Sequence, residues 1–142
     1  METKSCVEVK NEWSIVVARQ AGRRLSKKIG FGSVEQSRIT TAISELARNI
    51  YLYASKGEIT IKMIESAGEK GLRKGIEIIA KDSGPGIADI KQAMVDGFST
   101  SCGLGAGLPG VKRLMDEFNI DSVVGEGTVI SAKKMAPVTR RT

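Results

Sequence analysis

The most informative stretch of the chain is GLGAGLPG at residues 103–110, which leads directly into a segment with a leucine-rich helical face. Five of the chain's 16 glycines fall between Gly97 and Gly110. Backbone amides of residues without Cβ atoms can converge on an anion, and a helix that begins near Pro109 would add its positive end to that attraction. A flexible linker seldom leads straight into such a helix. The stretch therefore predicts a phosphate-binding loop.

The spacing of these glycines does not fit three common phosphate-binding motifs. Gly105 to Gly110 matches G-x-G-x-x-G, but it follows a serine/threonine-rich segment and not a strand, which argues against a dinucleotide-binding fold. A Walker loop would need Lys directly after Gly110, where this chain has Val111. The glycine loop of eukaryotic protein kinases is excluded because the chain contains no HRD or DFG sequence. A different nucleotide-binding fold is needed.

Composition narrows the classes of protein that remain. The chain has 142 residues and a formal net charge of +6, which fits one globular domain. It has no histidine, which excludes Ser-His-Asp hydrolysis, His-ligated zinc and autophosphorylation on His. Cys6 and Cys102 are too far apart for a CxxC site, so a reduced, cytoplasmic setting is expected.

Neither a membrane nor a nucleic acid is expected as a partner. No run of apolar residues is long enough for a membrane span. The chain has only one Trp, two Tyr and three Phe for base stacking, and its positive charge is scattered except at Lys133, Lys134, Arg140 and Arg141. This pattern favours a solvated surface and a basic tail over a nucleic-acid groove.

The hydrophobic pattern predicts both strands and helices. One helix begins after an Asn11 cap and ends at Gly30, and it carries an apolar stripe at four-residue spacing: Trp13, Val17, Ala21, Leu25 and Ile29. A second helix begins at a Ser33–Gln36 capping-box pattern and continues to Tyr53. The other expected elements are strands at 5–10, 59–63, 76–78, 120–124 and 128–132, helices at 89–95 and 109–118, a polar loop at 65–71 and an irregular segment at 97–108.

This order predicts an α+β fold, a two-layer sandwich with helices on one face of a mixed, largely antiparallel sheet. The last two strands are joined at Gly125-Glu-Gly127, which is too tight for a helical crossover. No repeat or internal boundary is visible, so residues 1–135 are expected to form one domain, followed by a basic tail at 136–142.

Two polar residues border the apolar stripe of the second helix. Glu45 and Asn49 stand one helical turn apart on the same face, so both can point at one ligand. A carboxylate can take a proton from an attacking hydroxyl, and an amide oxygen is a suitable ligand for Mg²⁺. A Glu and an Asn on a helix are usually solvent-exposed residues without a functional role. The pair therefore indicates a ligand site only in combination with the other motifs.

A predicted strand ends at Asp82 and is followed by the turn Ser-Gly-Pro-Gly86. An aspartate at a strand end beside a pocket can accept a hydrogen bond from an amino group such as that of adenine. Gly84 and Gly86 would let a flat base lie against the backbone. Taken alone, the segment also fits an ordinary turn, and its departure from D-x-D-x-D-G argues against a calcium loop.

Three motifs in sequence order resemble the N box, G1 box and G2 box of the GHKL (Bergerat-fold) ATPases: Glu45/Asn49, Asp82-x-Gly84-x-Gly86 and Gly103-x-Gly105-x-Gly107. Thr128 is similar to the family's closing element, whose hydroxyl helps hold adenine. The resemblance implies ATP and Mg²⁺ as cofactors, with Glu45 as general base and Asn49 on the metal. The residues it implies for nucleotide binding are Asn49, Asp82, Gly84, Gly86, Ile87, Gly103, Leu104, Gly105, Ala106, Gly107, Leu108 and Thr128.

Within that family, nearly the whole chain resembles the serine/threonine kinases of the bacterial stressosome. The resemblance implies phosphorylation of Ser or Thr on STAS-domain scaffold and antagonist proteins (RsbS- and RsbR-like), then release and activation of an RsbU-like phosphatase. One departure is that residues 97–108 contain no Lys or Arg, whereas related anti-sigma kinases carry a basic residue near the terminal phosphate. Lys112 or a partner's residue is left for that role.

Two other functions stay open at this point. An ATP-gated module could sequester a sigma factor or an activator without transferring phosphate. A detached sensor-kinase catalytic domain is disfavoured, because the chain has no phosphoacceptor His and no dimerisation helices of its own.

Overall fold

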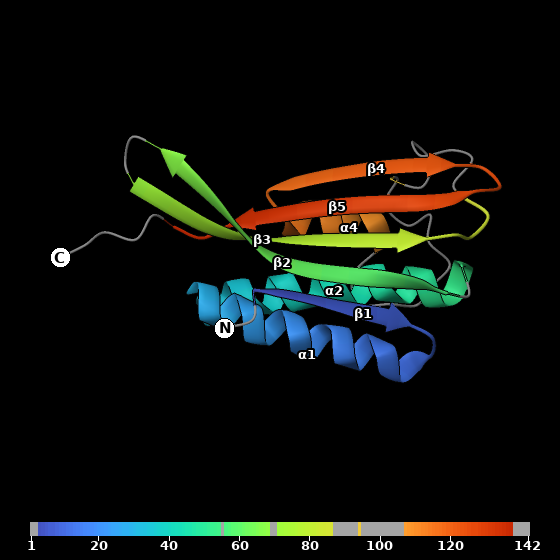
Figure 1. Cartoon of the computed structure of the whole chain (residues 1–142), viewed down its shortest axis with the longest axis horizontal. Helices are drawn as coiled ribbons and strands as arrows, with labels where there is room; N and C mark the ends of the chain where they lie inside the picture. The colour runs from blue at the N-terminus through green and yellow to red at the C-terminus, as the bar shows by residue number, and fades with distance from the viewer. Residues whose placement is uncertain (1–2, 55, 69–70, 87–93, 95–106, 138–142) are drawn as a thin grey trace.

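The computed structural model describes residues 3–54, 56–68, 71–86, 94 and 107–137. In these ranges the elements are β1 (Lys4–Val9), α1 (Glu12–Ile29), α2 (Ser33–Tyr53), β2 (Gly57–Gly68), β3 (Gly71–Asp82), α4 (Gly107–Leu114), β4 (Glu117–Val123) and β5 (Gly127–Met135). The strands form one sheet in the order β1-β2-β3-β5-β4, and every pairing is antiparallel. The helices cover one face of this sheet (Figure 1). The predicted α+β sandwich is therefore confirmed, and its sheet is antiparallel at each described pairing.

The core lies between α2 and the covered face of the sheet. Alternate strand residues point inward, among them Ile61 on β2 and Ile78 on β3, and both are fully buried. On α2 the buried residues recur at helical spacing: Ile39, Ile43, Leu46 and Ile50. Burying each such side chain contributes about 1.5–3 kcal/mol. The central helix is therefore fixed to the sheet along most of its length.

The predicted ends of α1 are confirmed. Asn11 is the N-cap, because its Oδ1 accepts from the Ser14 backbone N–H at 3.1 Å, and Ser14 Oγ accepts in return from the Asn11 N–H at 3.4 Å. Gly30 closes the helix with φ of 109°, a left-handed conformation that favours glycine.

The expected apolar stripe of α1 needs a correction at its start. Trp13 is 67% exposed, because the buried side of α1 carries small residues such as Ala18, Ala21 and Gly22. A Cβ at Gly22 would collide with the Ile43 side chain on α2. Small residues thus allow α1 and α2 to approach closely, and Trp13 lies on the opposite side.

The predicted cap of α2 is wrong. Gly32 is the N-cap and makes no side-chain cap hydrogen bond, and Ser33 is already helical. Gln36 instead uses its Nε2 to donate to the Phe31 carbonyl at 2.7 Å. This bond fixes the sharp connection between α1 and α2.

Two further expected boundaries are also wrong. The loop expected at 65–71 is mostly strand, because β2 and β3 stay paired as far as Gly68 and Gly71. These strand ends are exposed on both faces, so they carry no alternating hydrophobic pattern. The helix expected at 109–118 ends at Leu114, and Phe118 lies in β4. The helix expected at 89–95 falls outside the described residues except for Met94, as does the tail beyond Pro137.

The open face of the sheet is polar. Glu77 on β3 lies between Lys62 on β2, at 3.4 Å, and Lys133 on β5, at 3.9 Å, and it accepts from Ser131 Oγ at 3.0 Å. These partly exposed pairs suit a solvated face and explain why the helices cover one side only. Among the described helices, none has the length and apolar character needed to cross a membrane.

Candidate functional site

Among the predicted site residues that the structure describes, those on the strands and on the turn after β3 gather at one end of the molecule. There β3 and β4 end, β5 begins and the last turn of α2 lies beside the start of β2 (Figure 1). Asp82, the last residue of β3, is the register partner of Gly57 on one side and of Thr128 on the other. The antiparallel pairing therefore brings together residues from distant parts of the sequence.

The Asp82 carboxylate is half-buried and held in one orientation. Its Oδ1 accepts from the Gly84 backbone N–H at 2.9 Å, which closes a small turn directly after the strand. No other hydrogen bond to this carboxylate is present among the described residues. This arrangement leaves the other oxygen, Oδ2, for a donor on a ligand.

Glycines let the surrounding backbone approach Asp82 closely. A Cβ at Gly127, where φ is 139°, would collide with the Asp82 carbonyl. A Cβ at Gly84 would lie 2.7 Å from Ala54 Cβ, and one at Gly57 would lie 2.6 Å from the Lys81 carbonyl oxygen. Any larger residue at these positions would push the strands or the end of α2 away from the site.

Gly86 marks the far side of the same turn. Its φ is 79°, and an added Cβ would lie 2.5 Å from the Val123 carbonyl oxygen at the end of β4. The Gly125 N–H also donates to the Pro85 carbonyl at 2.8 Å. The turn after β3 is thus packed onto the β4–β5 hairpin, and this close packing leaves no room for a side chain at Gly86.

Thr128 lies inside this arrangement. It is 5% exposed, and its Oγ1 lies 2.8 Å from Ser122 Oγ on the neighbouring strand. Sequence reasoning missed Ser122 and Gly57. Their only signal is cross-strand register, since Ser122 pairs with Thr128 and Gly57 pairs with Asp82, and that register requires the fold to be known.

Glu45 and Asn49 approach the site from α2. Glu45 is 4% exposed, which is unusual for a carboxylate, and Asn49 is half-buried one turn later. The next residue, Ile50, packs at the start of β2, where a Cβ on Gly57 would lie 2.9 Å from Ile50 Cγ2. The turn that carries Asn49 therefore lies over the end of the sheet that carries Asp82.

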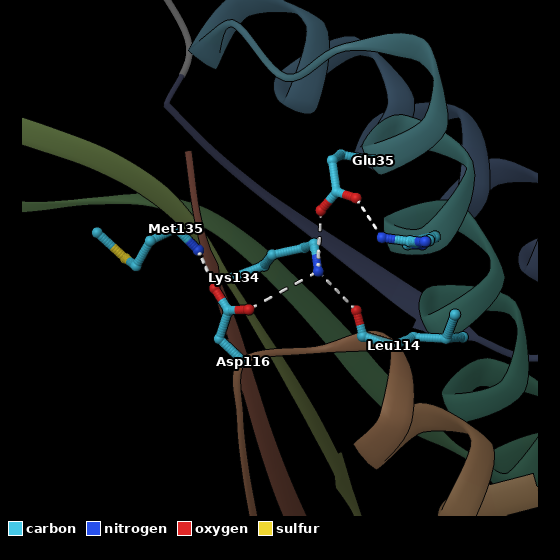
Figure 2. Close-up of polar contacts among 6 residues, drawn as sticks. Glu35, Leu114, Asp116, Lys134 and Met135 are labelled. Carbon is cyan, nitrogen blue, oxygen red and sulfur yellow. Dashed lines mark hydrogen bonds and ion pairs between the residues drawn. The ribbon is translucent and has the colours of Figure 1, made fainter. Parts of the chain in front are cut away.

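Helix α4 lies against α2 and is fixed at its C-terminal end. Figure 2 shows Lys134 Nζ donating to the Leu114 carbonyl at 2.9 Å and pairing with Glu35 at 2.9 Å. Because Glu35 is in the first turn of α2, the last turn of α4 lies beside the first turn of α2. Because α4 packs along α2, its N-terminus at Gly107 then lies further along α2.

Charge at the fixed end favours this arrangement. The hydrogen bond from Lys134 lowers the pKa of the Glu35 carboxyl, attraction to Lys134 and Arg38 lowers it further, and burial opposes them. Arg38 Nη1 also donates to Glu35 at 2.6 Å. The carboxylate is therefore ionised and paired at neutral pH.

The structure describes only part of the predicted nucleotide-binding set. Ile87, Gly103, Leu104, Gly105 and Ala106 lie outside the described residues. Gly107 and Leu108, expected in an irregular segment, are the first residues of α4, and Gly107 has φ of 68°. A glycine is suited to this position because the chain enters the helix through a left-handed conformation.

The residues present fit a magnesium ion that is bound mainly by a nucleotide. In the described part of the chain, no group of three Cys, Asp or Glu side chains could hold a metal alone. Mg²⁺ in nucleotide sites takes one or two protein oxygens, with phosphates and waters as its other ligands. The half-buried Asn49 amide on α2 can supply such an oxygen.

Comparisons with known proteins agree with this geometry. Residues 34–137 match the family model for histidine kinase-, DNA gyrase B-, and HSP90-like ATPases. The chain is 64% identical over 134 residues to the serine/threonine-protein kinase RsbT of Bacillus subtilis (strain 168), which covers 94% of this chain and 98% of that protein. It is 38% identical over 102 residues to an anti-sigma F factor of Thermoanaerobacter sp. (strain X514), which covers 68% of this chain and 67% of that protein.

A solved structure supports the fold. The crystal structure of the RsbU and RsbW domains of a Mycobacterium tuberculosis protein aligns with a TM-score of 0.58 at 15% identity. The alignment covers 97% of this chain but only 35% of that longer chain.

Proposed function

The chain belongs to the histidine kinase-, DNA gyrase B- and HSP90-like ATPase family, and we propose that it is a serine/threonine kinase that phosphorylates a protein partner with Mg-ATP. Its resemblance to the GHKL ATPases is confirmed by the family match. High identity to RsbT over nearly the full length of both chains supports the kinase activity. The observation that carries the proposal is the junction of Asp82, Thr128 and the Asn49 turn at one end of the sheet.

The adenine end of the nucleotide is assigned to Asp82 and Thr128. Asp82 Oδ1 is held by the Gly84 N–H, so Oδ2 is positioned to accept from the exocyclic amino group of adenine. Gly84 and Gly86 support this assignment indirectly, because they let the turn pack closely against Ala54 and Val123 and so fix the position of Asp82. Thr128, whose hydroxyl contacts Ser122, is assigned the polar contact on the other side of Asp82.

The phosphate end is assigned to the space between α2 and the start of α4. The N–H groups of the first turn of α4 have no acceptor within the helix, and together with the positive end of the helix dipole they attract negative charge there. Asn49 would hold the Mg²⁺ ion, which neutralises charge on the phosphate oxygens when bound. Gly107 and Leu108 belong to this region as the first residues of α4.

Glu45 is assigned as the general base. Its carboxylate would take the proton from the acceptor hydroxyl as the hydroxyl oxygen forms a bond to the terminal phosphorus, and ADP leaves with the electrons of the broken bond. The burial of Glu45 suits a general base, because few water molecules compete with the acceptor hydroxyl for hydrogen bonds to its carboxylate. The product is a phosphoserine or phosphothreonine on the partner.

Lys112 is poorly placed to neutralise the terminal phosphate. It lies exposed in the last turn of α4, whereas the nucleotide is assigned to the first turn. We therefore assign this charge to the α4 N–H groups and to a basic residue of the bound partner. Transfer would then depend on the correct partner being bound.

The partners we propose are STAS-domain proteins of the RsbS and RsbR kind as substrates and an RsbU-like phosphatase as the protein activated after release, all in the cytoplasm. This part of the proposal rests on the identity to RsbT.

The deciding experiment is transfer of labelled phosphate. The chain is incubated with Mg-ATP and a candidate STAS protein, and the phosphorylated residue is mapped by mass spectrometry. A matched sample with the acceptor changed to Ala separates specific transfer from contamination. Labelled Ser or Thr on the partner is expected, and nucleotide binding without any transfer would contradict a kinase.

An ATP-gated binding module is the second candidate, favoured by 38% identity to an anti-sigma F factor. In that case the partner would be retained in the presence of ATP and would carry no phosphate. Pull-down with ATP or ADP, analysed for phosphorylation in the same sample, distinguishes the two functions.

A further inference from the structure

Lys134 is a buried cation outside the site already described. Its side chain is 8% exposed, and its Nζ meets three oxygens: the Leu114 carbonyl at 2.9 Å, Glu35 at 2.9 Å and Asp116 at 3.8 Å (Figure 2). These groups come from the end of α4, the first turn of α2 and the segment before β4. One ammonium group therefore joins two helices to β5.

Two further hydrogen bonds hold the same joint together. The Asp116 N–H donates to the Lys133 carbonyl at 2.9 Å, and the Met135 N–H donates to Asp116 Oδ2 at 2.8 Å. The residues that follow α4 are thus tied to β5 on both sides of Lys134. Movement of α4 at this end would break several bonds together.

The charge of Lys134 stabilises the C-terminal end of α4 and thereby fixes the orientation of the helix. A cation on the last carbonyls of a helix complements the negative end of its dipole. Helix α4 has eight residues and is about 12 Å long. Its other end, at Gly107, is the end to which the nucleotide phosphates are assigned. Because the helix is short and rigid, its orientation at Leu114 sets the direction of its N-terminal N–H groups.

Filling space between the sheet and the helices would not by itself require an ammonium group. Burying a charge is unfavourable unless it is well paired, and apolar residues often replace buried ion pairs without loss of stability. The neighbouring β5 residues Ile130 and Ala132 show that this face accepts apolar side chains. What a methyl group cannot supply is the bond to the Leu114 carbonyl together with the pair to Glu35.

We propose that Lys134 is a positioning residue for the phosphate end of the nucleotide, holding α4 by its C-terminal carbonyl so that its N-terminus stays beside α2. This inference rests on the proposed nucleotide site. It assigns Lys134 no contact with ATP, and its effect passes through α4.

The test compares binding of Mg-ATP with binding of adenosine, which has the base and no phosphate. Lys134→Met should weaken Mg-ATP binding by about 3- to 30-fold, the usual range for coupling through packed elements, and leave the Kd of adenosine unchanged. Lys134→Arg, which keeps the charge and donors, should recover part of the loss. Lys133→Met is the matched control, because Lys133 lies on the open face at 3.9 Å from Glu77, and it should bind both ligands normally.

Each outcome bears on the proposal. Equal weakening of ATP and adenosine would show a general structural role and overturn it, as would a Lys134→Met protein that binds ATP normally. If Lys134→Met does not fold, the same ATP-to-adenosine comparison on Glu35→Gln decides, because this variant weakens the pair that holds Lys134 in place, and a normal ratio in it overturns the proposal. A wild-type chain that binds no Mg-ATP would refute the proposed function, and the inference with it.

Discussion

Replacing Asp82 with Asn tests how the site selects its base. The substitution keeps the shape of the side chain and leaves an oxygen to accept from the Gly84 N–H, now at 2.9 Å. It changes only the group on the other side, where Oδ2 becomes an NH₂ donor facing the amino group of adenine. The turn after β3 should therefore persist while the contact with the base is lost.

The size of the effect follows from the one hydrogen bond that is removed. A hydrogen bond to a charged group contributes about 1.5–3 kcal/mol, and each 1.4 kcal/mol corresponds to about tenfold in Kd. We expect ATP to bind about 10- to 100-fold more weakly. GTP should lose less, because the new amide can donate to the guanine carbonyl.

Isothermal titration with ATP and GTP measures both changes in one protein. Asp121→Asn is the matched control, since it makes the same chemical change at an exposed residue on β4 opposite Val129. Circular dichroism should give the same thermal midpoint for both variants as for wild type. An Asp82→Asn protein with wild-type ATP affinity and an unchanged ATP/GTP ratio would show that Asp82 does not read the base.

Four other outcomes are expected. Asn49→Ala should abolish Mg²⁺-dependent ATP binding with the fold intact, and titrations with and without Mg²⁺ check this; an unchanged Mg²⁺ effect removes Asn49 from the site. Glu45→Gln should lower the single-turnover rate of transfer at saturating Mg-ATP by about 10²- to 10⁴-fold, and a wild-type rate would exclude a base. Gly127→Ala should lower the free energy of unfolding in urea by at least about 1–3 kcal/mol, and more than Gly125→Ala, because Gly125 has a positive φ but open space around it; equal losses would contradict the close approach to Asp82. The pKa of Glu35 is lowered from 4.5 in the folded state, so its ion pair stabilises the fold fully above that value and is lost as pH falls through the lower folded pKa; the stability advantage over Glu35→Gln should therefore vanish in acid, and an advantage independent of pH would refute the pairing.

The sequence was sufficient for features that depend on local chemistry. Helix α1 begins after Asn11 and ends at Gly30 as predicted, because a helix cap is determined by side chains and backbone conformations within a few residues of the helix end. The alternation of Ile59, Ile61, Ile76 and Ile78 predicted a strand pair, because strand periodicity survives where one face is buried. The order of the three glycine-, aspartate- and asparagine-containing motifs along the chain was sufficient to identify the family.

Features that depend on tertiary packing could not be predicted. Trp13 fits a helical stripe in the sequence, but small residues on the adjacent face pack against α2 and leave it outside. Ser33 and Gln36 match a capping box, yet the chain enters α2 one residue earlier, at Gly32. Lys134 looks like part of a basic surface run with Lys133, but β5 continues past the expected end at 132 to Met135. Strand alternation therefore sends the two side chains to opposite faces, and only the fold shows that the face of Lys134 is the covered one.

The position of Trp13 has a practical consequence for spectroscopy. It is the only tryptophan in the chain, and with its indole mostly in water its fluorescence emission in the native protein already resembles that of an unfolded chain. Intrinsic fluorescence will therefore follow unfolding poorly, whereas circular dichroism will follow it well. The same property makes Trp13 a background-free probe, since a protein that covers the first turn of α1 would shift its emission to shorter wavelength without any added label.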